Sequence, residues 1–443
     1  MKILQINKFF YLNGGADKYF FEVSKLLKNH GHKVIFFSMK NQKNLFSKYE
    51  KYFIDYIDFS KAKFSFNALK NIGRTIYSLE AKRKIEKLIK DANPDIAHIH
   101  NIYHQISPSI LHVLKKYNIP VVMTLHDYKL ICPSYNLTNA LNSKIILCEK
   151  CKKQKYYNCF LNKCVKNSYF ASALNCLEAY IHNFLKIYEK NIDKFIAPSQ
   201  FMKDKCVEFG INADKIIVLP NFVNKSGIRN QELRIRNNEL GIMNHKLENY
   251  ILYFGRLSKE KGIDTLLKAV SQLSIIHPVK SCKAGVKQFN RVNYQLRIVG
   301  SGDLRLKFEK LAKKLNIKNK IKFFGHLEGE ELQKIIREAM FVVVPSIWYE
   351  NCPLSILESF ALGKSVIASK IGGIPELIKH SETGLLFEPG NAKDLANKIE
   401  CLLNRPDKII KMGQNALKIV REKFNADEHY KKLIKIYVQH LGG

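Results

Sequence analysis

Short apolar runs recur along the chain, and segments with helical hydrophobic periodicity lie between them. Six runs of strand length occur in the first half: Lys2–Ile6, Lys33–Ser38, Ile96–His100, Val121–Leu125, Lys194–Pro198 and Ile216–Pro220. Apolar strands that alternate with helices are typical of a parallel, doubly wound sheet. The first half therefore predicts one α/β domain.

A second series of strand-length runs follows a break in the pattern. Its members are Tyr250–Phe254, Leu296–Val299, Ile321–Phe324, Phe341–Val344, Ser365–Ala368 and Gly384–Phe387. The break is rich in Asn, Arg, Lys and Glu and has almost no periodic apolar residues, which predicts a linker. We expect α/β domains at residues 1–222 and 249–414, a linker at 223–248 and a helical C-terminal run at 415–443.

The length of 443 residues allows two domains that each bury a core. Open α/β sheets bind ligands outside the carboxyl ends of their strands, so the chemistry is expected in a cleft between the domains. No apolar run approaches the roughly 18 residues that span a bilayer. The N-terminal segment is interpreted as a strand rather than a signal peptide, because no small-residue cleavage site follows it.

Lys and Arg outnumber Asp and Glu by 73 to 39, which gives a formal net charge of +34. Such an excess favours an anionic partner: a phosphorylated substrate, nucleic acid or acidic lipid. The basic residues are spread along the whole chain, without a zinc-finger, RNP or helix-turn-helix signature. A nucleic-acid partner is therefore not expected.

A glycine-containing turn follows the first strand of each domain. Gly14–Gly15 precede a helix, where positive φ angles and open backbone N–H groups would bind a phosphate; an ordinary turn is the alternative. In the second domain Gly255, Arg256, Lys261 and Gly262 follow a buried strand directly. Arg and Lys would clasp a diphosphate there, with a solvated basic loop as the alternative.

Two carboxylates flank a predicted helix start in the second domain. Pro353 suits the first helical turn, which places Glu350 in the preceding loop and Glu358 inside the helix. Free N–H groups at a helix start hold a diphosphate, so the carboxylates would accept hydrogen bonds from sugar and ribose hydroxyls. A further pinched turn is formed by Gly372–Gly373 and ends in Glu376.

Together these motifs form an ordered set along nearly the whole chain: Gly14–Gly15, His126–Asp127, Gly255–Arg256, Lys261–Gly262, Glu350 and Glu358, and Gly372–Gly373 with Pro375–Glu376. The set resembles the family-4 retaining glycosyltransferases, also called glycosyl transferases group 1, of the bacterial surface-polysaccharide type. The resemblance implies the GT-B fold, with two Rossmann-like doubly wound domains that face a cleft. The first domain would bind the acceptor and the second the nucleotide sugar.

The resemblance also implies residue roles. Arg256 and Lys261 would hold the donor diphosphate, and Glu358 would contact the ribose. Glu350 would face the transferred sugar, and His126 would contact that sugar from the end of its strand; a structural histidine is the alternative. The glycines expected to line the donor are Gly14, Gly15, Gly372 and Gly373. The C-terminal helix would cross back to the first domain.

No Asp-x-Asp triplet occurs in the sequence, so we expect a metal-independent enzyme whose cations and helix dipole neutralise the diphosphate. No cofactor is expected beyond the nucleoside-diphosphate sugar as co-substrate. An insertion at about 132–176 is rich in cysteine, and Cys148, Cys151, Cys159 and Cys164 have the spacing of structural zinc ligands. Reduced thiols without metal are the alternative.

Aromatic and basic residues interleave between Phe46 and Lys90, for example at Phe64–Arg74. This pattern suits helices that dock on anionic lipid, although ordinary packing helices with a solvated basic face are an equal alternative. We therefore expect a cytoplasmic protein that is peripheral on the inner face of the cell membrane.

The expected activity is transfer of a sugar (EC 2.4) to a glycan or lipid-linked acceptor in capsule, O-antigen or exopolysaccharide assembly. One alternative is a nucleotide-sugar epimerase or hydrolase of the same fold, which needs acid and base carboxylates in the cleft. Another is a noncatalytic sugar-nucleotide-binding protein. Product stereochemistry and acceptor dependence separate these functions.

Overall fold

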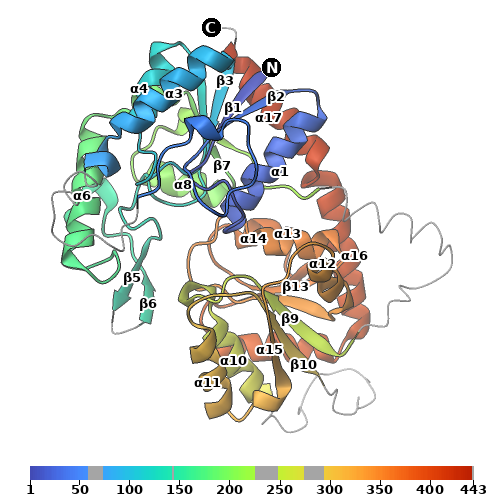
Figure 1. The fold of residues 1–443 in the computed structure, drawn as a ribbon. Coiled ribbons are helices and arrows are strands. Elements are labelled where there is room, and N and C mark those ends of the chain that lie inside the picture. The colour runs from blue at the N-terminus through green and yellow to red at the C-terminus, as the bar shows by residue number, and fades with distance from the viewer. Residues whose placement is uncertain (58–72, 142–143, 225–247, 274–293, 442–443) are drawn as a thin grey trace. The chain divides into compact units, whose positions relative to one another are not determined.

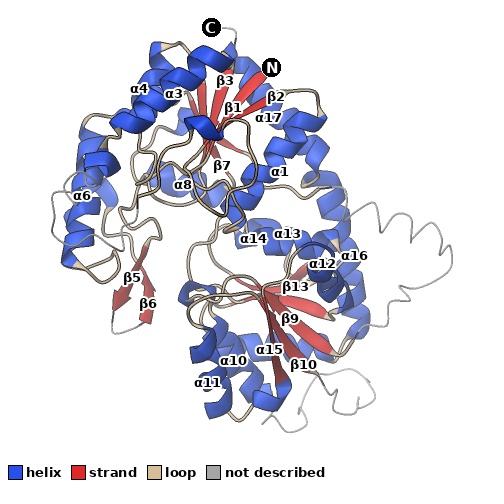
Figure 2. Ribbon diagram, in the orientation of Figure 1, coloured by secondary structure: helices blue, strands red, loops and turns tan. Residues whose placement is uncertain are grey.

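The computed structural model describes residues 1–57, 73–141, 144–224, 248–273 and 294–441. The chain divides into two compact units, Met1–Asn221 with Asp427–Gly443, and Phe222–Ala426. We call them the N-terminal and the C-terminal unit. Each contains a six-stranded sheet, drawn as red arrows in Figure 2. Most of the expected linker lies outside the described residues.

The sheet of the N-terminal unit has the order β2-β1-β3-β4-β7-β8 (Figure 1). Its strands are β1 Lys2–Ile6, β2 Lys33–Phe37, β3 Ile96–Ile99, β4 Val121–Thr124, β7 Lys194–Ala197 and β8 Ile216–Val218. All neighbouring strands are parallel. Every residue of β3 and β4 is buried, as expected when helices cover both faces of a sheet.

The helices around this sheet are α1 Gly15–Asn29, α3 Leu79–Ala92, α4 Ser109–Lys116, α5 Tyr157–Leu161, α6 Tyr169–Phe184, α7 Ile187–Asn191, α8 Gln200–Glu208 and α17 Ala426–Leu441. Three of them begin at a serine: Ser78, Ser168 and Ser199 each accept a backbone hydrogen bond from the first turn. A serine cap satisfies an N–H group that the helix leaves open, which fixes where these helices start.

The C-terminal unit has the sheet order β11-β10-β9-β12-β13-β14, again with parallel neighbours. Its strands are β9 Tyr250–Phe254, β10 Gln295–Val299, β11 Ile321–Gly325, β12 Phe341–Val344, β13 Val366–Ser369 and β14 Gly384–Phe387. Its helices are α10 Ile263–Leu273, α11 Arg305–Lys314, α12 Gly329–Glu338, α13 Leu354–Ala361, α14 Ile374–Leu377, α15 Ala392–Leu403 and α16 Pro406–Lys423.

The residues of β9 alternate between two hydrophobic cores. Tyr250, Leu252 and Phe254 belong to one core, and Ile251 and Tyr253 belong to the other. Successive side chains of a strand point to opposite faces, so each core lies on one face of the sheet. Burial on both faces explains the continuous apolar run in the sequence.

The predicted fold class is confirmed, since both sheets are parallel and doubly wound. Two features differ from the sequence interpretation. An antiparallel hairpin, β5 Thr138–Leu141 with β6 Lys144–Leu147, lies in the cysteine-rich insertion. The C-terminal run is not one helix, because α16 ends at Lys423 and α17 begins at Ala426.

Candidate functional site

Each sheet has one point at which the strand order reverses, and ligands of doubly wound sheets bind there, outside the carboxyl ends of the strands. In the C-terminal unit this switch point lies between β9 and β12. The loop after β9 carries Arg256 and Lys261, and the loop after β12 carries Ser346 and Glu350. Three of the sequence-predicted site residues, Arg256, Lys261 and Glu350, therefore lie on the two loops at the switch point.

An ion pair joins these loops. Nζ of Lys261 lies 2.6 Å from Oε1 of Glu350, and the hydroxyl of Ser346 donates to the same oxygen at 2.6 Å. Burial alone would raise the pKa of Glu350, but Lys261 and Ser346 outweigh it and hold the pKa below its ordinary value. Glu350 is thus a buried, ionised carboxylate that can accept hydrogen bonds.

Glycines let neighbouring loops approach Glu350 closely. Gly372 has a φ of +59°, and a Cβ there would lie 2.2 Å from the backbone oxygen of Glu350. Gly373 donates its N–H to the same oxygen at 2.7 Å. Gly262 has a φ of +67°, and a Cβ there would lie 1.9 Å from the backbone oxygen of Pro345. These glycines fix the loop that carries Glu350, a packing role that the sequence did not reveal.

Arg256 belongs to the loop after β9, whereas Glu358 lies on α13 of the same unit. Nη2 of Arg256 lies 3.6 Å from Oε1 of Glu260, and the Arg256 side chain is 63% exposed. Glu358 is the fifth residue of α13, which begins directly after Pro353. Arg256 is therefore open to a ligand, and Glu358 is held by a helix rather than a loop.

The loop after β10 was not singled out by the sequence interpretation. Gly300 has a φ of +136°, and a Cβ there would lie 1.9 Å from the backbone oxygen of Gly255. Gly302 has a φ of +156°, and a Cβ there would lie 2.5 Å from the backbone oxygen of Leu257. The two glycines pack this loop against the Arg256 loop. Two glycines one residue apart, directly after a strand, are the sequence pattern from which this close-packed loop could have been predicted.

In the N-terminal unit the switch point lies between β1 and β3. Asn7, which follows β1, accepts a hydrogen bond from the N–H of Asn101 at 3.2 Å and donates to Oδ1 of Asp17 at 2.8 Å. Burial raises the pKa of Asp17 to about 6, although the hydrogen bond from Asn7 opposes this shift. These polar residues connect the ends of two strands with the first turn of α1.

Gly14 and Gly15 lie at the start of α1. Gly14 has a φ of −176°, which is extended backbone, and neither residue is among the glycines with positive φ. The expectation of positive φ at this pair is therefore wrong. A Cβ at Gly14 would meet nothing within 4 Å, so the helix start is open, and donor binding there stays a prediction.

His126 lies directly after β4 and belongs to a chain of histidines. Its Nε2 lies 2.9 Å from Nδ1 of His100, and Nε2 of His100 lies 2.8 Å from Oε1 of Gln5. An amide oxygen only accepts, so His100 carries its proton on Nε2 and accepts at Nδ1. Neutral His126 is therefore the Nε2–H tautomer, and its lone pair is on Nδ1.

Burial keeps these rings neutral. It lowers the pKa of His126 and of His98 to about 3 and that of His100 well below its ordinary value. Helix α17 also contacts this group of histidines, because the hydroxyl of Tyr437 lies 2.6 Å from Nδ1 of His98. A neutral His126 suits hydrogen bonding to a hydroxyl rather than proton donation as an imidazolium.

The cysteines of the insertion do not form the expected zinc site. Cys151 and Cys159 are buried in an apolar cluster with Cys176, and Cys164 packs at its margin. In the part of the chain that the structure describes, no group of three or more His, Cys, Asp or Glu residues is placed to hold a metal ion. Burial raises the pKa of the Cys151 thiol, so it packs as a small apolar side chain.

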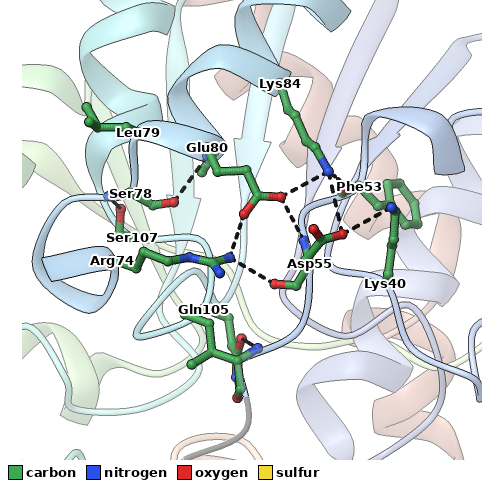
Figure 3. Close-up of polar contacts among 12 residues, drawn as sticks. Lys40, Phe53, Asp55, Arg74, Ser78, Leu79, Glu80, Lys84, Gln105 and Ser107 are labelled. Atoms are coloured by element: carbon green, nitrogen blue, oxygen red, sulfur yellow. Dashed lines mark hydrogen bonds and ion pairs between the residues drawn. The ribbon is translucent and has the colours of Figure 1, made fainter. Parts of the chain in front are cut away.

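The segment expected to contact lipid is described only in part, because residues 58–72 lie outside the described ranges. Around it, basic residues have acidic partners: Nη2 of Arg74 lies 2.6 Å from Glu80, and Nζ of Lys84 lies 3.0 Å from Glu80 (Figure 3). These pairs neutralise two of the cations on which a lipid contact would depend. No helix among the described residues has the length and apolarity to cross a membrane.

Two family models match the chain. The model of Glycosyltransferase Family 4 matches residues 13–226, and the model of Glycosyl transferases group 1 matches residues 241–419. The first range holds His126, and the second holds Arg256, Lys261, Glu350 and Glu358. Together the two models take in most of the chain.

Curated relatives match over shorter stretches. The uncharacterized glycosyltransferase MJ1607 of Methanocaldococcus jannaschii is 30% identical over 262 residues, 57% of this chain and 61% of the relative. The amylovoran biosynthesis glycosyltransferase AmsK of Erwinia amylovora is 24% identical over 270 residues, 60% of each protein. The chain thus matches about three-fifths of the length of these relatives.

The fold is also similar to solved structures. The Anabaena protein HepE, crystallised with UDP and glucose, is 17% identical, and the match covers 98% of this chain and 99% of HepE with a TM-score of 0.64. At this identity the likeness shows the fold, which is the predicted GT-B fold. On the two family models, the chain belongs to the family-4, group 1 glycosyltransferases.

Proposed function

We propose that the protein is a retaining glycosyltransferase that moves a sugar from a nucleoside-diphosphate donor to an acceptor without a metal ion. The observation that carries this proposal is the ion pair of Lys261 and Glu350 at the switch point of the C-terminal sheet. A cation beside an ionised carboxylate, both on glycine-packed loops, suits a ligand that bears phosphates and hydroxyls together.

Each residue of this unit has a role in the proposal. Arg256 and Lys261 bind the diphosphate with the open N–H groups at the start of α13. Glu358 accepts hydrogen bonds from the ribose. Glu350 accepts them from hydroxyls of the transferred sugar, since its lowered pKa keeps it ionised at neutral pH. When the diphosphate is bound, Lys261 interacts with both the phosphate and Glu350.

The N-terminal unit recognises sugar hydroxyls in this proposal. His126 contacts these hydroxyls as a neutral ring, because His100 fixes its proton on Nε2. Gly14 leaves the start of α1 open, and Gly14 and Gly15 are proposed to contact a phosphate or a hydroxyl there. The proposed acceptor is a lipid-linked glycan in surface-polysaccharide assembly, at the cytoplasmic face of an anionic membrane. The amylovoran relative and the net charge of +34 support this choice.

The first experiment measures the melting temperature of the purified protein with UDP-, GDP- and ADP-sugars. UDP-glucose comes first, since HepE was solved with UDP and glucose. A ligand at a hundred times its Kd adds about 2.7 kcal/mol of stability, so one donor series should raise the melting temperature. A flat response to all three series contradicts the donor assignment.

The second experiment follows the donor that binds. Turnover that needs a lipid-linked glycan and keeps the anomeric configuration of the donor, measured by NMR of the product, supports a retaining transferase. Epimerised or hydrolysed sugar without acceptor favours an epimerase or hydrolase instead. Tight donor binding without any turnover favours a noncatalytic binding protein.

A further inference from the structure

Large apolar side chains are exposed mainly between Ile146 and Leu185, a stretch that covers most of the cysteine-rich insertion and the whole of α6. The described residues include 21 exposed ones, and 11 of these lie between Ile146 and Leu185. Those 11 are Ile146, Leu147, Tyr157, Phe160, Leu161, Tyr169, Phe170, Leu177, Tyr180, Phe184 and Leu185. Concentrated exposure of this kind marks an interaction surface rather than ordinary scatter.

Helix α6 carries its polar side inward. Its buried face holds Asn175, Glu178 and His182. Nζ of Lys129 donates to Asn175 at 3.0 Å and to Glu178 at 2.8 Å, and Nε2 of His182 lies 3.0 Å from the backbone oxygen of Ile76. Hydrogen bonds therefore fasten this helix to its unit.

The opposite side of α6 is apolar and exposed. Phe170, Leu177 and Phe184 follow one another at intervals of seven residues, which places them on one face of the helix. Phe184 is 86% exposed. Aromatic residues of the neighbouring segment lie beside the helix, with the rings of Phe160 and Tyr169 5.2 Å apart. We call Phe160, Tyr169, Phe170, Leu177 and Phe184 the α6 face; Figure 1 shows α6 beside the β5–β6 hairpin.

Lysines accompany this face. Seven lie between Ile146 and Lys186, against two acidic residues, Glu149 and Glu178; one of the seven, Lys152, pairs with Glu208 at 2.7 Å. Both acids already have cationic partners, Lys205 at 2.7 Å and Lys129 at 2.8 Å. Nζ of Lys163 lies 4.3 Å from the ring centre of Tyr169. The face therefore combines aromatic side chains with positive charge.

We propose that the α6 face docks on the surface of an anionic lipid bilayer. Aromatic and leucine side chains enter the headgroup boundary, and lysines attract acidic lipids. A second copy of the chain fits this face less well, because two molecules of net charge +34 repel each other. This inference rests on the membrane partner named in the proposed function. It places the membrane contact on the insertion and α6 instead of on the segment around Phe64–Arg74.

The test is co-sedimentation of the full-length protein with vesicles of phosphatidylcholine alone or with added phosphatidylglycerol. The parent should bind the vesicles that contain phosphatidylglycerol, and more weakly as salt is raised. The triple variant Phe170→Ser, Leu177→Ser, Phe184→Ser should lose about tenfold or more in binding, because apolar area drives insertion. The matched control is Leu306→Ser on α11, which is 70% exposed and should bind like the parent.

Three outcomes overturn the proposal: binding of the triple variant as tight as that of the parent, no preference of the parent for phosphatidylglycerol, or a parent oligomer that the triple variant dissociates. Should the triple variant fail to fold, Phe184→Ser alone should weaken binding about threefold. Vesicle binding needs no turnover. The donor-induced rise in melting temperature should be equal in parent and variants, so failure of the docking proposal is distinct from failure of the proposed transferase.

Discussion

At the scale of single residues, the proposed donor site gives two carboxylates different tasks. Glu350 is paired with Lys261, whereas Glu358 lies on α13. We expect Glu358→Ala to remove hydrogen bonds to the ribose and to weaken donor binding by about 1 to 3 kcal/mol. Isothermal titration with the donor checks this. Glu382→Ala, at a side chain 65% exposed, is the control, and equal affinity of both variants would contradict the ribose assignment.

His100 is expected to act on the sugar through His126. His100→Phe removes the acceptor for the N–H of His126 and leaves Oε1 of Gln5 without its donor. The activation free energy that corresponds to kcat/KM should therefore rise by about 1 to 3 kcal/mol. The ring-nitrogen shifts of His126 in ¹⁵N NMR should move away from a pure Nε2–H tautomer. His100→Gln, which can accept and donate, should restore part of both. Unchanged nitrogen shifts in His100→Phe would show that His100 does not set the tautomer.

The histidine chain also shows why the candidate site was only partly predictable. Motifs close together in sequence, such as Arg256 with Lys261, were found from spacing alone. His98 and His100 stand in an apolar run, where a histidine is interpreted as core. Their partners Gln5 and Tyr437 are 95 and 339 residues away, and only the fold brings them together. Spacing also suggested zinc at four cysteines, three of which, Cys151, Cys159 and Cys164, pack in an apolar cluster.

At the scale of elements, central strands such as β4, β9 and β12 were predictable because they are buried on both faces and form continuous apolar runs. The predicted strand at Phe341–Val344 has the observed bounds, and that at Ile96–His100 is one residue too long. The hairpin of β5 and β6 was missed, since Thr138–Leu141 is half polar and shows no continuous apolar run. The division between α16 and α17 was missed because apolar residues continue through it.

The loop that carries Glu350 depends on a glycine at Gly372. Gly372→Ala would place a Cβ 2.2 Å from the backbone oxygen of Glu350 at a φ of +59°. We expect a loss of stability of about 2 to 4 kcal/mol and weaker donor binding, because Glu350 must shift. Gly390→Ala is the matched control, since its φ is +75° with nothing within 4 Å of the Cβ; it should cost about 1 kcal/mol. Urea unfolding of both variants measures the difference, and equal losses would show that only backbone strain matters.

At the scale of the whole molecule, buried histidines distinguish the two units. Among the described residues, every buried histidine lies in the N-terminal unit: His98, His100, His182 and His429. Burial lowers the pKa of His98 and His429 to about 3 in the fold, whereas the pKa in an unfolded chain is about 6.5. The C-terminal unit instead depends on Glu350, whose pKa lies below its ordinary value.

These shifts predict an order of acid unfolding. A histidine held neutral contributes stability above pH 6.5 that is lost as pH falls, by about 1 kcal/mol per pH unit for each of His98, His100 and His429. The contribution of Glu350 is lost only below about pH 4.5. Between about pH 6.5 and 5, protection against hydrogen exchange, relative to the intrinsic rate at each pH, should therefore fall in β1 and β3 before it falls in β9 and β12. His429→Gln, which keeps a hydrogen-bonding amide near Tyr19 and Pro220 without a titrating group, should make the pH dependence shallower. Simultaneous loss of protection in both sheets, or earlier loss in β9, would mean that the buried histidines do not control acid stability.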